Sequence, residues 1–274
     1  MMRAVPAENH GSEQKMLGSY MQRQRLELGL TQAQVAALLF MSSSGFEKYE
    51  NGQRVPTVAA IRSWCAALEL PRYKRRKVWS MVMGEDLTVA AGRLEVVTAA
   101  ELNLMNHMPG PAFLHRVPEY YVLAANTRAV EMFPWLDPAL GTPDRPINVI
   151  IQMMTDPRAR RALVNWEAIV HRLIYILKEN SLGIVPEAEI AVIRQACQAN
   201  PYFDRMWDTA MPTTAYYDDT VIVREPGSGE EIAFQMDSLR WAHPWRDIEM
   251  FSLTPRNTDG VPPLHETVPG IFAW

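Results

Sequence analysis

The sequence predicts an all-α N-terminal domain followed by an α+β domain. Three observations support this order. Apolar residues recur at helical spacing through residues 12–70, they recur at the same spacing through 156–183, and residues 215–255 alternate as strands do. A chain of 274 residues, 48% of them hydrophobic, is long enough to bury two separate cores.

The first helix is expected from Ser12, a candidate N-cap, to Leu28. Gly29 would end this helix, because glycine adopts the left-handed backbone conformation without steric cost. The spacing of the apolar residues predicts an inner face made of Leu17, Met21 and Leu28.

A second helix is expected at once, because Thr31 and Gln34 have the spacing of a capping box. The residues that would face the core from this helix are Val35, Leu38 and Leu39.

A third, shorter helix is expected after a tight turn, with Ser42 as its N-cap. Phe46 and Tyr49 lie three residues apart and predict its inner face, and Asn51-Gly52 would end it. A fourth helix should start near Pro56, with an apolar face formed by Ile61, Trp64 and Leu68.

The third helix is small and polar on its outer face. Two helices joined by a tight turn indicate a helix-turn-helix, whose second helix lies in the major groove of DNA. Serine can donate or accept a hydrogen bond, glutamate can accept from a cytosine amino group, and lysine can reach guanine or phosphate. Each such residue alone is more typical of a solvated helix surface. Together they predict a DNA-reading set of Ser43, Ser44, Glu47 and Lys48.

Charge is distributed unevenly along the chain. Residues 1–83 hold 12 Lys+Arg and 6 Asp+Glu, a net charge of +6. Because the whole chain carries −4, the remaining residues carry a net charge of −10. A basic block suits a polyanion such as double-stranded DNA, because each neutralised phosphate releases counterions. A merely solvated surface is the alternative. The densest basic run, residues 71–79, fits either an additional DNA-backbone arm or a solvated helix face with Val78 and Trp79 packed inward.

The segment "LTQAQVAALLFMSSSGFEKYENGQRVPTVAAIRSWCAALEL" resembles the DNA-binding domain of the XRE-type (lambda-repressor-like) transcription regulators, a resemblance that covers residues 12–70. It implies that Gln32 touches a DNA phosphate or anchors a neighbouring DNA-reading residue, and that Asn51 and Arg54 contact the DNA backbone. It also implies a structural ion pair between Arg25 and Glu50. We further expect a homodimer on a near-palindromic site, because a single module buries too little surface for tight specific binding.

Helices and strands are both expected in the second half. "EYYVLAAN" predicts a strand that runs into a helix at Asn126, and Pro186 suits the start of another helix. Strands then alternate around the hairpin turn "EPGSGE", and "IEMFSLTP" is the last of them, which predicts one antiparallel sheet. Residues 156–183 predict one long amphipathic helix with a stripe of Leu163, Trp166, Val170, Leu173 and Leu177.

The segments "YYVLAANTRAVEMF", "DPRARRALVNWE" and "NPYFDRMW", with the strands that follow, resemble the MmyB-like ligand-binding domain over residues 95–255. The resemblance implies a PAS-like fold that follows an XRE-type helix-turn-helix in bacterial regulators, and a hydrophobic, fatty-acyl-like effector. The expected domains are residues 12–83 for DNA binding, a linker at 84–94, and residues 95–274 for ligand binding.

Apolar and aromatic side chains of the second half are candidates for lining an effector pocket, because adaptable side chains of this kind wall such cavities. Each of them is also a candidate core residue. If the acidic half docks another protein, no small molecule is needed, and we keep this alternative. The helix through Trp166 is the expected transmitter. The candidate ligand-binding residues are Met153, Trp166, Phe203, Met206, Trp207 and Phe234.

Other classes of function lack support in the sequence. The six histidines are scattered, and Cys65 and Cys197 have no Cys or His at metal spacing, so we expect no metal site and no cofactor. There is no Gly-rich phosphate loop and no Gly-x-Ser-x-Gly, so an enzyme is not expected. No apolar run of about 18 residues and no signal peptide occur, which predicts a cytoplasmic protein without a membrane partner.

Overall fold

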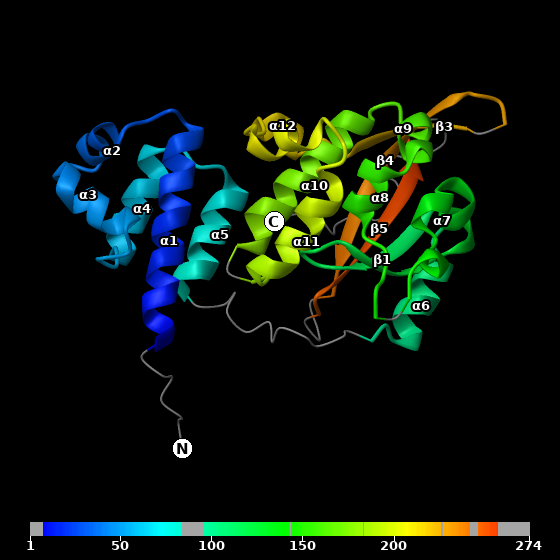
Figure 1. Cartoon of the computed structure of the whole chain (residues 1–274), viewed down its shortest axis with the longest axis horizontal. Helices are drawn as coiled ribbons and strands as arrows, with labels where there is room; N and C mark the ends of the chain where they lie inside the picture. The colour runs from blue at the N-terminus through cyan, green and yellow to red at the C-terminus, as the bar shows by residue number, and fades with distance from the viewer. Residues whose placement is uncertain are drawn as a thin grey trace, which may run out of the picture. The chain divides into compact units, whose positions relative to one another are not determined.

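A computed structural model describes residues 8–83, 96–142, 144–182, 184–225, 227–241 and 246–256. They form two compact units (Figure 1). The first unit contains the N-terminal helices together with His171–Tyr217, and the second contains Glu95–Val170 and Asp218–Trp274. The predicted linker at residues 84–94 lies outside the described residues, and the domain limits of 12–83 and 95–274 stay a prediction.

The N-terminal part of the first unit is helical, as the sequence predicts. Its first helix begins at Glu8, so Ser12 lies inside the helix and the prediction that it is the N-cap was wrong. Gly29 follows this helix with a φ of 67°, which confirms the left-handed stop. The five helices described before residue 84 are α1 (Glu8–Glu27), α2 (Gln32–Leu38), α3 (Ser43–Glu50), α4 (Val58–Ala67) and α5 (Arg72–Met83).

Side-chain caps set the starts of α2 and α3. The Thr31 hydroxyl accepts from the backbone N–H of Gln34, and the Gln34 side chain accepts from the backbone N–H of Thr31, which confirms the capping box. The Ser42 hydroxyl accepts from the backbone N–H of Gly45 and so caps α3, as predicted. These caps fix the short turn that joins the two helices.

The helical core is nearly the predicted one. Phe46, Ile61 and Trp64 are fully buried, and Leu39 is half-buried. The other predicted inner residues that are buried are Leu17, Met21, Val35, Tyr49 and Leu68. Two predictions were wrong, since Leu28 is 50% exposed and Leu38 is 48% exposed. Leu28 lies beyond the last residue of α1, and Ala36 takes the inward place on α2, so neither leucine reaches the core.

Gly18 allows α1 to approach the end of α3 very closely. A Cβ atom at this position would lie 2.4 Å from the carbonyl oxygen of Glu50 and 2.5 Å from that of Tyr49. Because these neighbours are backbone atoms, they cannot move aside as a flexible side chain would. The absence of a side chain at residue 18 therefore sets the distance between the two helices.

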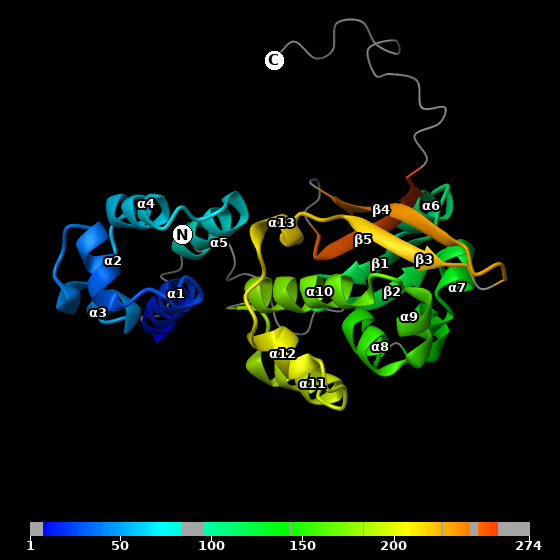
Figure 2. The ribbon, with the colours of Figure 1, turned by 90° about the horizontal axis from the view of Figure 1, so that it is seen from above.

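The second unit is built on a five-stranded antiparallel sheet in the order β2-β1-β5-β4-β3. Figure 2 shows α6 (Ala99–Asn106) on one side of this sheet and α8 (Val149–Thr155) and α9 (Pro157–Ala162) on the other. Met105 of α6 packs on Leu114 and Met250 of the sheet. The strands are β1 (Ala112–Arg116), β2 (Tyr121–Ala125), β3 (Thr220–Arg224), β4 (Glu231–Arg240) and β5 (Ile248–Pro255).

Most of the described residues between β2 and β3 are helical. Asn126 caps the first of these helices, which confirms the predicted passage from strand to helix. Pro186 stands at the N-terminus of α11, also as predicted. The elements are α7 (Thr127–Met132), the short 3-10 helices η2 (Pro134–Leu136) and η3 (Pro138–Leu140), α8 (Val149–Thr155), α9 (Pro157–Ala162), α10 (Trp166–Ser181), α11 (Glu187–Cys197), α12 (Phe203–Asp208) and α13 (Thr213–Tyr216).

The long helix predicted for residues 156–183 is two helices, α9 and α10, so the single-helix prediction was wrong. Between them, Leu163 bridges to Val223, and the N–H of Val164 donates to the carbonyl of Ile222. The Asn165 side chain donates to the carbonyl of Thr220 and accepts from the N–H of Ile222. Pairing with β3 thus replaces helical hydrogen bonds at the break.

Strand β1 was not predicted, although it lies inside the sheet between β2 and β5. Its burial does not alternate, because Ala112, Phe113, Leu114 and His115 are all buried. A strand covered on both faces lacks the period of two that identifies a half-exposed strand.

Among the described residues, no helix combines the length and the hydropathy that a transmembrane span requires.

Candidate functional site

The outer face of α3 presents the predicted DNA-reading residues to solvent. Ser43, Ser44, Glu47 and Lys48 are all exposed, whereas Phe46, Tyr49 and Glu50 point into the helical core. The inward residues repeat at helical spacing, so the outward ones form one continuous polar face. A short helix with this face can enter the major groove and offer donors and acceptors to base edges.

The three flanking residues that the resemblance implied as DNA contacts differ in position. Asn51 is the C-cap of α3 and is exposed. Arg54 is exposed, and its guanidinium lies 5.5 Å from the centre of the Tyr49 ring. Gln32 is half-buried, and its amide donates to the Glu50 carboxylate at 2.7 Å. Gln32 therefore ties α2 to α3 in this structure.

The predicted ion pair between Arg25 and Glu50 is present. Arg25 Nε donates to Glu50 Oε1 at 2.7 Å, and a second guanidinium nitrogen donates to Oε2 at 3.0 Å. Arg25 also donates to the carbonyl of Leu30 at 2.8 Å. Both partners are buried, and the bonds to Glu50 raise the pKa of Arg25 further. The pair holds α1 and α3 in a fixed orientation.

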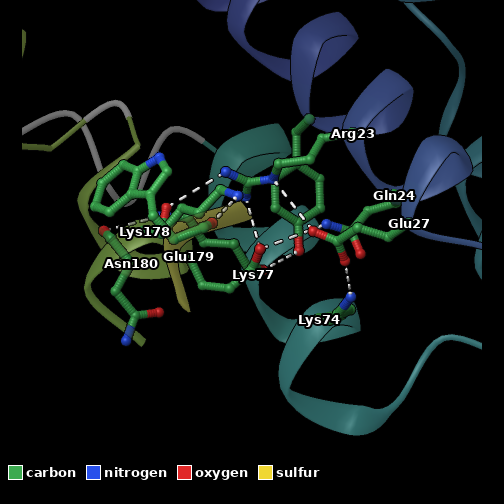
Figure 3. Close-up of polar contacts among 10 residues, drawn as sticks. Arg23, Gln24, Glu27, Lys74, Lys77, Lys178, Glu179 and Asn180 are labelled. Atoms are coloured by element: carbon green, nitrogen blue, oxygen red, sulfur yellow. Dashed lines mark hydrogen bonds and ion pairs between the residues drawn. The ribbon is translucent and has the colours of Figure 1, made fainter. Parts of the chain in front are cut away.

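A second buried carboxylate joins α10 to the N-terminal helices (Figure 3). Glu179 accepts from the Tyr20 hydroxyl at 2.9 Å, from Arg23 at 2.7 Å and from Gln24 at 3.5 Å. Burial, with the negative charge of Glu179, raises the pKa of Tyr20 well above its ordinary value, so the phenol remains a donor. We call these four residues the Glu179 cluster.

Lysines of α5 support the same contact. Lys74 pairs with Glu27 at 2.6 Å, and Lys77 donates to the carbonyl of Asn180 at 3.5 Å (Figure 3). Both lysines are buried in these contacts. Part of the basic run at residues 71–79 therefore packs inside the protein, and only the rest of the run can face solvent or DNA. Sequence reasoning missed this role because the partners lie 47 and 103 residues away.

Aromatic rings extend the contact between α5, α10 and α13. The ring of Tyr73 stacks on that of Tyr216 with centroids 3.7 Å apart, and Tyr217 meets it edge-on at 6.0 Å. Burial raises the pKa of Tyr73 and, more strongly, that of Tyr175. Both phenols therefore stay uncharged to a higher pH than an exposed tyrosine would.

The six predicted ligand-binding residues are distributed over both units. Met153, Trp166 and Phe234 belong to the second unit, where the Trp166 indole donates to the carbonyl of Met153 at 2.8 Å. The other three lie on α12 in the first unit, where the rings of Phe203 and Trp207 are 5.7 Å apart. All six except Trp207 are buried, and their role in ligand binding stays a prediction.

A buried polar residue that sequence reasoning left out lies among aromatic rings of the sheet. His115 of β1 is fully buried, with ring centroids 5.1 Å from Tyr120 and 4.3 Å from Phe251. Its Nε2 lies 3.5 Å from Glu249, which also pairs with Arg240 and Ser238. Burial lowers the pKa of His115 to about 4, although Glu249 opposes the shift.

Within the described ranges, no group of three or more His, Cys, Asp or Glu side chains is arranged to hold a metal ion. Cys65 and Cys197 are free and buried, and burial raises the pKa of the Cys197 thiol to about 12. A thiol of such a pKa is protonated at neutral pH and therefore unreactive.

The capped helix pair and the polar face of α3 define a helix-turn-helix DNA-binding protein. Residues 16–78 match a helix-turn-helix domain, and residues 96–259 match the MmyB-like transcription regulator ligand binding domain. Because the second match covers more than half of the 274 residues, the chain belongs to the MmyB-like transcription regulators. No curated protein matches the chain.

These matches confirm the predicted combination of an N-terminal helix-turn-helix with a C-terminal MmyB-like domain. The predicted fold class is confirmed as well, since a helical N-terminal region precedes helices with a five-stranded antiparallel sheet. Both matched domains are those of transcription regulators, not of enzymes.

We expect Arg25→Ala to lower the free energy of unfolding by roughly 3–5 kcal/mol, because the change leaves the Glu50 carboxylate buried without its cation. DNA affinity should fall with it, since the orientation of α3 depends on the pair. Thermal unfolding and DNA titration measure the two effects. Arg224→Ala is the control: its pair with Glu231 is exposed, so its loss should cost about 1 kcal/mol or less. An unchanged melting temperature for Arg25→Ala would contradict the structural role.

His115 should make the second unit sensitive to acid. As pH falls from 6.5 towards 4, the unfolded chain takes up a proton on His115 that the folded unit does not. The free energy of unfolding should therefore drop by up to about 3 kcal/mol over this window, and the loss should stop below pH 4. The charged groups near His115 are Glu249, which opposes this shift, and Arg240, which adds to it.

Urea unfolding at pH 7.5 and 4.5 tests this acid sensitivity. His115→Gln should remove most of the difference between the two pH values, whereas His107→Gln, at an exposed position on the surface, should leave it in place. Equal acid sensitivity in both variants would mean that other groups cause the loss.

Proposed function

We propose that this transcription regulator reads specific sequences of double-stranded DNA in the major groove through Ser43, Ser44, Glu47 and Lys48. The observation that carries the proposal is the continuous exposed polar face that these residues form on α3. Asn51 and Arg54 are exposed beside this face and are proposed to contact the DNA backbone. Gln32 is assigned the role of anchoring α3, because its amide is bonded to Glu50.

Charge supports DNA as the partner. Residues 1–83 carry a net charge of +6, and the remaining chain carries −10. The basic part attracts phosphates, whereas the acidic part repels them. The two parts therefore suit different partners, and the exposed Lys48 lies on the basic one.

The regulator is proposed to act as a homodimer of the XRE type. One small DNA-binding module buries only about 600–1,000 Å² of protein surface on DNA, which is at the low end for specific binding. Two copies on half-sites about 34 Å apart would double the interface and place both α3 helices on the same side of the duplex. We expect the protein to work inside bacterial cells, where its DNA target is.

The C-terminal part is proposed to bind a small hydrophobic effector in a PAS-like fold. Support comes from the match to a ligand binding domain and from the antiparallel sheet with helices between β2 and β3. Apolar walls with few polar groups are typical of such sites. In the second unit, which contains the sheet, the candidate lining residues are Met153, Trp166 and Phe234. The net charge of −10 favours the second candidate, in which this part docks a basic surface of another protein instead.

Helix α10 is the proposed transmitter of the effector signal. Its first turn contains Trp166, which is bonded to Met153, and its last turn contains Glu179, which is bonded to Tyr20 and Arg23 of α1. An effector that prefers one position of α10 would act on α1 through the Glu179 cluster. The effect on DNA affinity is limited to the difference in effector affinity between the two positions.

Substitutions on α3 should distinguish base-specific contacts from electrostatic binding to DNA phosphates, which does not depend on sequence. Ser44→Ala and Glu47→Ala should each change the preference at one base pair by about 1–3 kcal/mol. Lys48→Ala should weaken binding to all sequences and reduce its salt dependence. Gel-shift titrations with selected and random duplexes at 50 and 200 mM salt measure both effects. If the unmodified chain binds selected and random DNA equally, sequence-specific reading is wrong.

The Glu179 cluster should be required for the response to effector. Mass spectrometry of organic extracts from protein purified from its host identifies bound compounds, and titration of DNA with and without each compound measures coupling. We expect a change in DNA affinity of about 5- to 150-fold for the unmodified chain. Glu179→Gln should reduce this change strongly, because it removes the charge that holds Arg23, while calorimetry shows unchanged effector binding.

Glu187→Gln, an exposed change on α11, is the matched control and should keep full coupling. Full coupling in Glu179→Gln would exclude the cluster as the route. An empty extract, together with unchanged DNA affinity across a lipid panel, would favour the protein-docking alternative.

A further inference from the structure

Phe40 occupies an unusual position in the turn between α2 and α3. Its side chain is 98% exposed, more than any other large hydrophobic side chain that the structure describes. A single exposed apolar residue is common on protein surfaces, so exposure alone indicates no function. The backbone of Phe40, however, makes this residue costly for folding.

Phe40 has a φ of 53°, in the left-handed region that glycine adopts freely and that bulky residues avoid. Its N–H donates to the carbonyl of Ala37, a bond that any residue except proline could make at this position. The exposed ring buries nothing in return. Glycine would satisfy the same turn without strain, so stability of the fold does not explain a phenylalanine here.

Phe40 is close in the chain to the DNA-reading residues. Phe40 precedes Ser42, the N-cap of α3, by two residues, and Ser43 and Ser44 follow in the first turn of the helix. The N-terminal residues of a recognition helix are those that approach base edges. Leu38, at 48% exposure, and the half-buried Met41 are apolar neighbours of Phe40 in the chain. Apolar residues thus directly precede, in the chain, the end of α3 that is proposed to enter the groove.

We propose that Phe40 is a specificity-determining DNA contact whose ring packs on the 5-methyl group of a thymine at the edge of each half-site. The inference rests on the proposed DNA-reading function of α3. The thymine methyl is the apolar group that a base pair presents in the major groove, and phenylalanine is a suitable partner for it. The serines read by hydrogen bonds, and Phe40 adds recognition of a group that cannot make them.

The test uses the full chain and DNA sites selected by it from a random duplex library. Phe40→Gly should raise the melting temperature by roughly 2 °C or more, because backbone strain is relieved and no packing is lost. The same change should weaken binding to the selected site by about fivefold to tenfold. If Phe40 affected only the stability of the domain, the stabilised variant would bind the selected site at least as well as the unmodified chain.

Replacement of single thymines by deoxyuridine removes the methyl group alone. At one position per half-site, this replacement should weaken binding of the unmodified chain by about fourfold, and it should not affect Phe40→Gly. Phe40→Asn, which tolerates the same backbone conformation, should repeat the result for Phe40→Gly. Leu140→Ala removes an exposed apolar side chain, 55% exposed, far from α3 in sequence and should change neither measurement.

Equal affinity of Phe40→Gly and the unmodified chain, or the same response of both to every deoxyuridine, would overturn the contact. Normal DNA binding by Phe40→Gly with lost self-association or lost binding to RNA polymerase would overturn it as well, and would assign the ring to a protein partner. Failure of the unmodified chain to select any site would reject the DNA-reading function itself, and the Phe40 contact with it.

Discussion

The buried pair between Arg25 and Glu50 is the interaction on which the reading surface depends. One carboxylate is bonded to Arg25 of α1 and to Gln32 of α2, and its own residue closes α3. Three helices therefore share a single charged group inside the core. Such a group is costly to bury, and its bonds have direction, so the helices cannot rotate about each other without losing them. The polar face of α3 is held outward as a result.

Local signals were enough to predict most of the N-terminal half. The capping box at Thr31, the cap at Ser42 and the stop at Gly29 each depend on a few adjacent residues, and all three are present. Leu28 and Leu38 have the right spacing but lie at helix ends or on the outward side, where periodicity does not decide burial. Which of two neighbouring positions faces the core depends on the other helices, and that is not local information.

Long-range contacts account for the remaining errors. The break before α10 exists because Asn165 bonds to β3, more than fifty residues later, and Glu179 meets Tyr20 across 159 residues. Strand β1 has no period of two, because both of its faces are covered. His115 was visible in the sequence only as one histidine among six, since its burial next to Glu249 requires the register of β1 with β5. The Glu179 cluster and the contact between His115 and Glu249 therefore could not be predicted from the sequence.

Gly18 has a consequence for how a signal can act on this regulator. At residue 18 the backbone carbonyls of Tyr49 and Glu50 lie where a Cβ atom would be, so α1 and the end of α3 meet main chain to main chain at this point. A displacement of α1 is therefore expected to move the end of α3 with it, because no side chain at residue 18 can repack to absorb the shift. If the proposed effector acts through α1, we expect it to shift α3 as a unit and to leave the polar face of this helix unchanged. The bases that the protein prefers should stay the same in every effector state, and only the fraction of time spent on them should change.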